Sequence, residues 1–116
     1  MRNKQQKVNK LPIEDFKTES IIKHLSQEQL DYYRQFLENK EMVAFLNDEE
    51  LITTVKLFLK NNLNITTTSK SAFMHRNTLI YRLEKVKQEV GLNIKNFEEA
   101  TILENILMLN ELLKKN

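Results

Sequence analysis

The sequence predicts an all-α fold, a small helical bundle of five to seven helices built around a helix-turn-helix. Its 116 residues include one glycine and one proline, so the residues that interrupt helices are scarce. Apolar residues recur at helical spacing in several segments, whereas strand signals are few. Near the middle of the chain, a short and a longer helical segment meet at a tight corner. The length allows one domain with a small appendage.

Composition excludes several classes of protein. The chain has no cysteine, which rules out a disulfide, a thiolate metal site and a cysteine nucleophile. The longest apolar run is the five residues 42–46, too short for a membrane span or a signal-peptide core. We therefore expect a cytoplasmic protein, in keeping with the absence of cysteine.

The rest of the chain is expected to be organised around the corner and the two helices that it joins. Asn64 is a favourable N-cap, so the first helix is predicted to begin at Ile65 and to reach about Ala72. The corner falls at residues 73–75. The second helix is predicted over about 76–90, where Gly91 can supply the left-handed residue that ends it. In a helix-turn-helix, such a second helix enters the DNA major groove.

The second helix has an apolar and a polar face. At 100° per residue, one narrow sector directed to the core holds Leu79, Leu83, Val86 and Val90. Asn77 and Tyr81 lie on the opposite side, where base edges would be. Arg76 and Arg82 lie on the two flanks, within reach of phosphates. The candidate DNA-binding residues are Asn64, Thr66, Thr67, Lys70, His75, Arg76, Asn77, Thr78, Tyr81, Arg82 and Lys85.

The charge pattern favours the same region. Residues 51–83 contain five basic residues and no aspartate or glutamate, although the whole chain has a net charge of only +2. An acid-free surface attracts polyanions, and the cations with the helix ends predict roughly four to six neutralised phosphates per copy. An ordinary amphipathic helix pair with a solvated polar face would give a similar pattern, and the pattern alone leaves both readings open.

The run His-Arg-Asn-Thr-Leu-x-Tyr-Arg-Leu at residues 75–83, with Gly91-Leu92 after it, resembles the C-terminal helix-turn-helix of the PucR/CdaR family. These proteins are bacterial regulators of purine and sugar-diacid catabolism. Asn64 and Thr68 also match the family pattern, and the layout is similar to the Fis-type helix-turn-helix. The resemblance covers roughly residues 14–113. It implies an all-helical transcriptional regulator that binds double-stranded DNA with a second copy.

The sequence departs from the family pattern at several positions. Leu63 stands where glycine is common, Ser69 where alanine is usual, and Ala72 where leucine is usual. Ile80 and Glu84 occupy positions that are often basic, so we expect weaker electrostatic affinity. The family usually carries a long N-terminal sensory region, and we expect this chain to lack one.

Three segments are predicted along the chain. Residues 1–11 form a disordered basic tail, with a basic arm touching phosphates as the alternative. Residues 12–47 form an N-terminal helical appendage. In it, Thr18 is expected to cap a helical turn, Ser26 and Gln29 to form a capping box, and the apolar link at 42–46 to be buried. Residues 48–116 form the helix-turn-helix DNA-binding domain with a C-terminal packing helix.

Two further helices are predicted within residues 48–116. Asp48, Glu49 and Glu50 open the first, whose inner face is Leu51, Ile52, Val55, Phe58 and Leu59. The second runs from Phe97 to about Lys115. Its tightest apolar stripe is Ile102, Ile106, Leu109 and Leu113, with further stripes at Leu103 and Leu107 and at Met108 and Leu112. A helix apolar on several sides is buried on several sides, either against the N-terminal helices or against a second copy.

No enzymatic site is predicted. Adjacent acidic residues occur only near helix starts, where the helix dipole explains them. His24 and His75 lie far apart without a ligand-spaced partner, and there is no glycine-rich phosphate loop. We therefore expect a DNA-binding protein without cofactor or metal, acting as a homodimer or as a heteromer with a full-length relative. The alternative is a protein-interaction module derived from such a regulator that does not itself read DNA.

Overall fold

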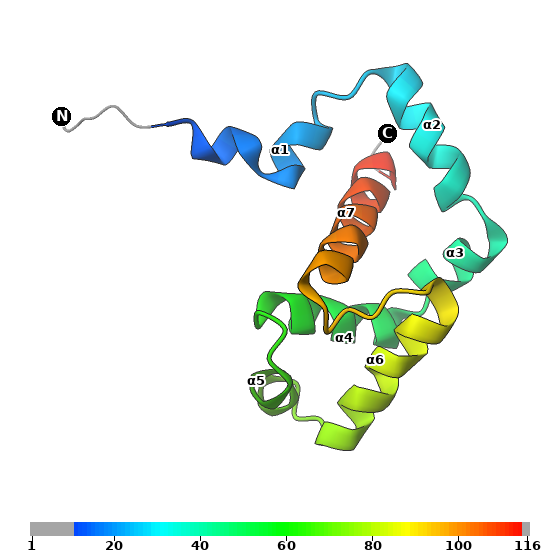
Figure 1. Cartoon of the computed structure of the whole chain (residues 1–116). Helices are drawn as coiled ribbons and strands as arrows, with labels where there is room; N and C mark the ends of the chain where they lie inside the picture. Colours follow the sequence, from blue (N-terminus) through cyan, green and yellow to red (C-terminus); the bar gives the residue numbers. More distant parts are fainter. Residues whose placement is uncertain (1–10, 115–116) are drawn as a thin grey trace.

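The computed structural model describes residues 11–114, which form helices and no strand (Figure 1). The predicted all-α class is confirmed. A 3-10 helix, η1 (Ile13–Phe16), is followed by α1 (Thr18–Ile22), α2 (Gln27–Leu37), α3 (Lys40–Leu46), α4 (Glu49–Lys60), α5 (Ile65–Ser71), α6 (Arg76–Val90) and α7 (Phe97–Lys114). Residues 1–10 of the expected basic tail, and the predicted helix end at Lys115, lie outside the described residues.

The N-terminal helices confirm one predicted cap and contradict another. The capping box of α2 is present, because the Ser26 side chain accepts from the Gln29 amide at 3.1 Å and Gln29 accepts from the Ser26 amide at 2.8 Å. The prediction for Thr18 is wrong. This residue is the first of α1, and Lys17 before it has extended backbone angles and no capping side chain. Helix α2 buries Leu30 alone and leaves Tyr33 and Phe36 exposed.

The apolar link at 42–46 is a helix, α3, and it is only partly buried. Asn39 caps it by accepting from the amides of Glu41 and Met42. Phe45 is fully buried, whereas Val43 is exposed. A helix turns 100° per residue, so five consecutive apolar residues cannot all face the core. Phe45 packs with residues of α4 and α6, so the core extends across the proposed domain boundary at residue 47.

Helix α4 is the centre of the core. Asp48 caps it by accepting from the Leu51 amide at 3.1 Å, as the acidic start predicted. Leu51, Val55 and Phe58 are buried, which confirms the centre of its predicted face. The helix ends at Lys60, and Asn61 is its C-cap. The buried residues of the main core are Phe45, Leu51, Val55, Phe58, Leu79, Leu83, Val86, Ile94, Ala100, Leu103 and Leu107.

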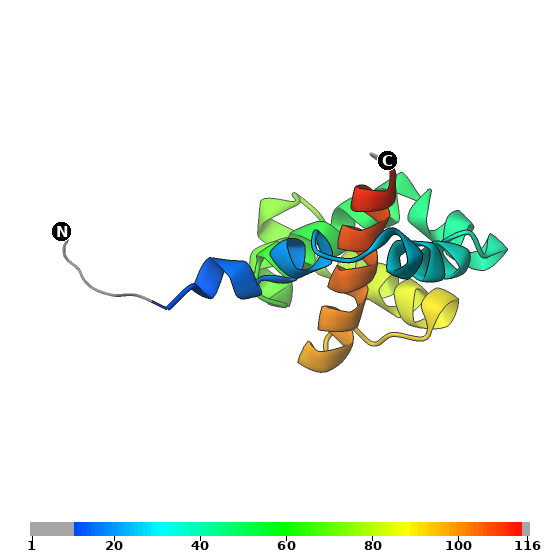
Figure 2. The same ribbon diagram turned by 90° about the horizontal axis from the view of Figure 1, so that it is seen from above.

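Helix α7 runs through the middle of the molecule, between the α4–α6 end and the N-terminal helices (Figures 1 and 2). Ala100, Leu103 and Leu107 form its innermost face and join the main core. The stripe predicted as tightest is not the innermost one, since Ile102 is exposed. The other sides of α7 contact α1 and α2. Packing on the N-terminal helices, one of the two expected uses of this helix, is therefore present.

Candidate nucleic-acid interface

Helix α5 begins at the predicted cap. The Asn64 side chain accepts from the Thr67 amide at 2.7 Å. Thr68 is fully buried and donates its hydroxyl to the Asn64 carbonyl at 2.7 Å, which anchors the first turn of α5 to the core. Leu63, where the family often has glycine, has a φ of +61°, a conformation that glycine adopts with least strain.

The corner between α5 and α6 contains an unusual residue, Phe73. Its φ is +51°, in the left-handed region that bulky side chains avoid, and its side chain is 98% exposed. The Met74 amide donates to the Ser69 carbonyl at 2.9 Å and closes the turn. The corner thus displays an aromatic ring in solvent, directly before α6.

Helix α6 has the predicted bounds at both ends. His75 is its N-cap, and its Nδ1 accepts from the Asn77 amide at 3.1 Å. This bond requires Nδ1 to be unprotonated, so a neutral ring carries its proton on Nε2. Gly91 ends the helix with a φ of +76°, as predicted.

The two faces of α6 are those predicted from its sequence. Leu79, Leu83 and Val86 are buried, and Val90 is half-buried. Asn77, Thr78 and Tyr81 are exposed on the other side. The first two turns of α6 therefore present amide, hydroxyl and phenol groups to solvent.

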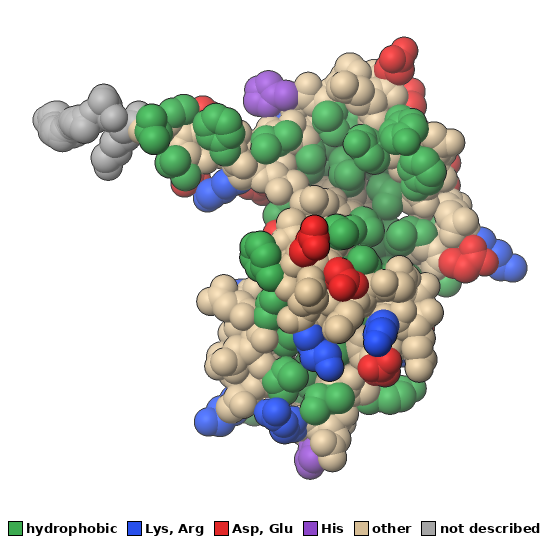
Figure 3. Space-filling view, viewed as in Figure 1, with side chains coloured by type: hydrophobic (Ala, Val, Ile, Leu, Met, Phe, Trp, Pro, Cys, Tyr) green, Lys and Arg blue, Asp and Glu red, His purple; other side chains and the backbone are tan. Residues whose placement is uncertain are grey.

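Arg76 joins the two helices of the motif. Its Nη1 donates to the Thr66 hydroxyl of α5 at 3.2 Å, while both side chains stay exposed. Thr67 and Lys70 of α5 are also exposed. Basic and histidine side chains gather at this end of the molecule, over α5 and the start of α6 (Figure 3). Asn64 and His75, which cap these two helices, are exposed as well.

Arg82 lies on the flank of α6, as predicted, and its side chain is paired with α4. Its Nη1 donates to the Thr54 hydroxyl of α4 at 2.8 Å, and its Nη2 pairs with the Glu50 carboxylate at 3.1 Å. The side chain is 20% exposed. The flank of α6 faces α4, and the long arginine side chain reaches across to it.

Lys85 is also paired within the molecule. Its Nζ lies 3.4 Å from the Asp48 carboxylate and 3.8 Å from that of Glu89. The hydrogen bond with Asp48 raises the pKa of Lys85. The Leu51 amide, and then Lys85, lower the pKa of Asp48. Lys85 therefore lies beside the N-terminus of α4.

The five basic residues of the acid-free stretch do not share one surface. Lys56 and Lys60 of α4 line a cleft together with Glu104 and Glu111 of α7. Arg82 faces α4. Only Lys70 and Arg76 remain on the surface formed by α5 and the start of α6, so the local positive charge is smaller than the linear count indicated.

Sequence reasoning missed two kinds of residue at this site. Phe73 was assigned to the corner without a role, and its residue type gave no signal of its positive φ, because bulky side chains avoid that region. The partners of Arg82 and Lys85 on α4 were missed because nothing local indicates them. They lie 28 and 37 residues away in the chain, respectively.

The PucR C-terminal helix-turn-helix domain family matches residues 51–109, which span α4 to most of α7. The chain belongs to this family. The match contains every candidate residue of the surface described above. It also contains Thr54, one partner of Arg82, and begins one residue after Glu50, the other partner.

Three relatives illustrate the similarity. The purine catabolism regulatory protein of Bacillus subtilis (strain 168) is 30% identical over 105 residues, covering 89% of this chain and 17% of the relative. The carbohydrate diacid regulator of Escherichia coli (strain K12) is 37% identical over 65 residues, 56% of this chain and 17% of the relative. YxkF, an uncharacterised protein of Bacillus subtilis (strain 168), is 37% identical over 75 residues, 65% of this chain and 25% of its own length. The chain thus spans a quarter or less of these relatives. No solved structure matches it.

Two further findings concern residues 11–114. No helix in this range is long and apolar enough to span a membrane. The same residues contain no group of three or more histidine, cysteine, aspartate or glutamate side chains placed to hold a metal ion.

Proposed function

We propose that the chain binds double-stranded DNA sequence-specifically, with α6 in the major groove, as part of a transcriptional regulator. The observation that carries the proposal is the start of α6, where exposed Asn77, Thr78 and Tyr81 project beside a helix N-terminus. A helix of this kind fits the major groove, and asparagine can pair with adenine through two hydrogen bonds. The names of the purine and carbohydrate diacid regulators agree with this role.

The candidate residues take three roles in this proposal. Asn77, Thr78 and Tyr81 read base edges. Thr66, Thr67, Lys70 and Arg76, which are exposed on α5 and at the start of α6, contact phosphates. The remaining candidates position the helices: Asn64 and His75 cap them, and Arg82 and Lys85 hold α6 against α4.

We further propose that two copies act together in the cytoplasm, without catalytic activity. Two-fold helix-turn-helix proteins commonly read half-sites about one helical turn, ~34 Å, apart. A pair of chains would therefore read an inverted repeat. A heteromer with a full-length relative would place one such surface beside a sensory region.

The test is a matrix of variants against DNA sequences, after selection of bound DNA from a random pool. Asn77→Ala should relax the preference at one base position by about 1–3 kcal/mol. Gln88→Ala is the matched control, because it removes an exposed amide from the same face of α6, about three turns further on. Uniform weakening of all sequences by Asn77→Ala would show that α6 does not read bases in this orientation.

The second candidate function is a protein-interaction module that does not read DNA. It is favoured by the exposed aromatic group on α2, where Tyr32 packs edge-on against Tyr33 and Phe36 at 5.2 Å. If the chain binds DNA, replacing the exposed Lys70 and Arg76 by neutral residues should abolish regulation and leave the fold intact. If regulation persists in that variant and no DNA is ever enriched, the interaction module is the better description.

A further inference from the structure

The described chain begins with a short apolar segment that its own fold does not cover. Residues 11–17, which we call the arm, contain η1 and lead into α1. Ile13 is 61% exposed and Phe16 is 69% exposed, and Leu11 is exposed as well. The arm extends away from the body of the molecule (Figures 1 and 2). Three large apolar side chains on so short a segment are costly to leave in water, which indicates a partner.

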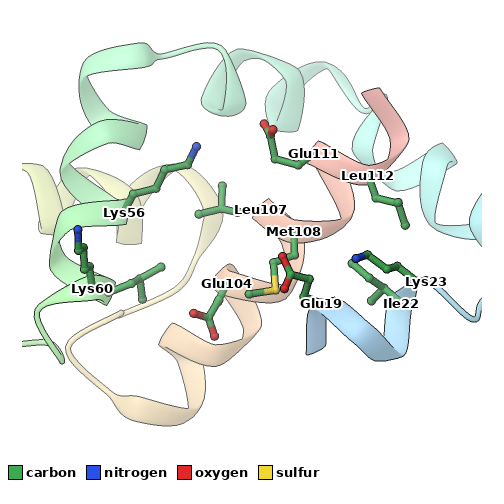
Figure 4. Close-up of a pocket in the computed structure, with 11 residues that line it drawn as sticks. Glu19, Ile22, Lys23, Lys56, Lys60, Glu104, Leu107, Met108, Glu111 and Leu112 are labelled. Carbon is green, nitrogen blue, oxygen red and sulfur yellow. The ribbon is translucent and has the colours of Figure 1, made fainter. Parts of the chain in front are cut away.

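The same molecule has an apolar cleft that none of residues 11–114 fills. The cleft is formed by α1, α4 and α7 and has a volume of about 520 Å³. Leu59, Leu107 and Met108 line its interior, and Figure 4 shows charged side chains around them. Lys56 and Lys60 come from the α4 wall, and neither forms an ion pair with a described residue.

The arm and the cleft are complementary in chemistry. The arm carries apolar Ile13 and Phe16 with the acidic Glu14 and Asp15 between them. Glu14 pairs with Lys17 of the arm at 2.6 Å, which leaves the Asp15 carboxylate without an ion pair among the described residues. Apolar side chains suit the interior of the cleft. Glu19, Glu104 and Glu111 line the α1 and α7 sides, so the place that suits Asp15 is the α4 wall with its two lysines.

The connection between arm and cleft disfavours insertion within one chain. Glu19, Ile22 and Lys23, at α1 and its end, themselves line the cleft. The arm precedes α1 directly and points outward from it (Figure 1). To enter its own cleft, the chain would have to reverse at Lys17, whose φ of −68° and ψ of 145° continue the chain outward in extended form. A second copy needs no such reversal, and a two-fold exchange fills both clefts with the same contact.

We propose that two copies of the chain exchange their arms, each placing Ile13 and Phe16 in the α1–α4–α7 cleft of the other, with Asp15 against Lys56 and Lys60. This exchange supplies the surface for the pairing proposed above. It rests on that pairing and not on recognition of DNA.

The absence of cysteine makes a direct test possible. One batch of the full chain carries Asp15→Cys and a second, distinguishable in mass, carries Lys56→Cys. Mixed and mildly oxidised without DNA, the two should form a mixed disulfide dimer in preference to either symmetric dimer. The control batch carries Gln88→Cys, an exposed position on α6, a helix that does not line the cleft, and should give no such preference.

Three outcomes of this experiment have different meanings. A preferred mixed dimer supports exchange. A chain carrying both substitutions that closes only an internal disulfide, at a concentration where the unsubstituted chain is a dimer, overturns it, because the arm then enters its own cleft. Equal crosslinking with the control also overturns it. Because DNA is absent, each outcome is independent of whether the chain reads DNA.

A second measurement uses a matched pair of phenylalanines. Phe16 and Phe73 are both exposed, one on the arm and the other at the α5–α6 corner, so neither substitution by serine should unfold the chain. Phe16→Ser should raise the dimer dissociation constant on the order of ten- to one-hundred-fold, as loss of a buried aromatic side chain would. Phe73→Ser should leave it unchanged. Light scattering over a concentration series gives both values, and equal constants for the two variants overturn the proposal.

Discussion

Gly91 and Phe73 both have left-handed backbone angles, and only glycine adopts them without strain. Gly91 ends α6 at a φ of +76°, and a Cβ added there would meet no atom within 4 Å. Phe73 has a φ of +51° and gains nothing from burial, since its ring is almost wholly exposed. Strain at an exposed residue is commonly retained at functional sites. Phe73 is therefore a candidate functional residue of the corner.

Phe73→Gly should raise the free energy of unfolding by about 1 kcal/mol, because it relieves the left-handed strain and removes no packed side chain. Urea unfolding measures this. Gly91→Ala is the mirror control and should lower stability by about the same amount, since strain is its only cost. If Phe73→Gly also weakens DNA binding, the ring contacts the DNA. A destabilised Phe73→Gly variant would contradict the strain argument.

Arg82→Ala should lower the free energy of unfolding by roughly 1–2 kcal/mol. The guanidinium donates a charged hydrogen bond to Thr54, which is buried, and that bond is lost. The pair with exposed Glu50 adds little. Arg76→Ala is the control, because its exposed hydrogen bond to Thr66 should contribute less than about 0.5 kcal/mol. Thermal melts of both variants compare them, and equal stability would mean that the Arg82–Thr54 bond contributes nothing.

At the scale of elements, α4 and α6 are joined where α4 begins. Asp48 both caps α4 and pairs with Lys85 of α6. Its pKa is lowered in the folded chain, so its contribution to stability is present above pH ~4 and is lost as the pH falls through the lowered pKa. The pKa of Lys85 is raised, so its contribution is present below pH ~10.4 and is lost as the pH rises through the raised value.

Asp48→Asn isolates the titration of this carboxylate. Asparagine is an equally good N-cap, so the start of α4 is retained while the charge is lost. We expect the wild-type chain to be the more stable at neutral pH, and the difference to shrink as the pH falls below about 4. Thermal melts from pH 7 to pH 2 follow it. A difference that is constant over this range would show that the charge of Asp48 does not stabilise the fold.

The elements that were predicted correctly are those that local chemistry determines. Helix α6 was placed to the residue because its cap, its apolar sector and its terminal glycine all lie within the segment itself. Thr18 was misplaced because the preceding Lys17 begins the helix without a capping side chain. The inner face of α7 and the pairing of Arg82 depend on which helices lie opposite, and periodicity within one segment carries no such information.

At the scale of the whole molecule, the candidate DNA surface and the cleft lie in different places. The α5–α6 corner is at one end, and the arm and its cleft lie beyond α4, where α7 meets α1 (Figure 1). Pairing through arms would therefore leave both α6 helices uncovered. Under these two proposals the single chain provides two separable surfaces, one for pairing and one for DNA.

The charges available for DNA follow from the same arrangement. Arg82 and Lys85 are paired with Glu50 and Asp48, which leaves Lys70 and Arg76 as the cations of the candidate surface. A pair of chains should then neutralise about four phosphates through these side chains. At ~0.9 per phosphate, the logarithm of the binding constant should fall against the logarithm of salt concentration with a slope of about −3.6.

Two variants separate, in the salt dependence of DNA binding, an exposed basic side chain from one that is already paired with a carboxylate. Lys70→Ala should reduce the slope for a pair of chains by about 1.8, one phosphate per copy. Arg82→Ala should leave the slope unchanged even though it lowers stability, because its guanidinium already has a carboxylate partner. Fluorescence anisotropy with one DNA duplex over a series of salt concentrations, well below the melting temperature of each variant, gives the slopes. A reduction by Arg82→Ala as large as that by Lys70→Ala would mean that Arg82 leaves Glu50 for a phosphate when DNA binds, and that α4 and α6 separate at that point in the complex.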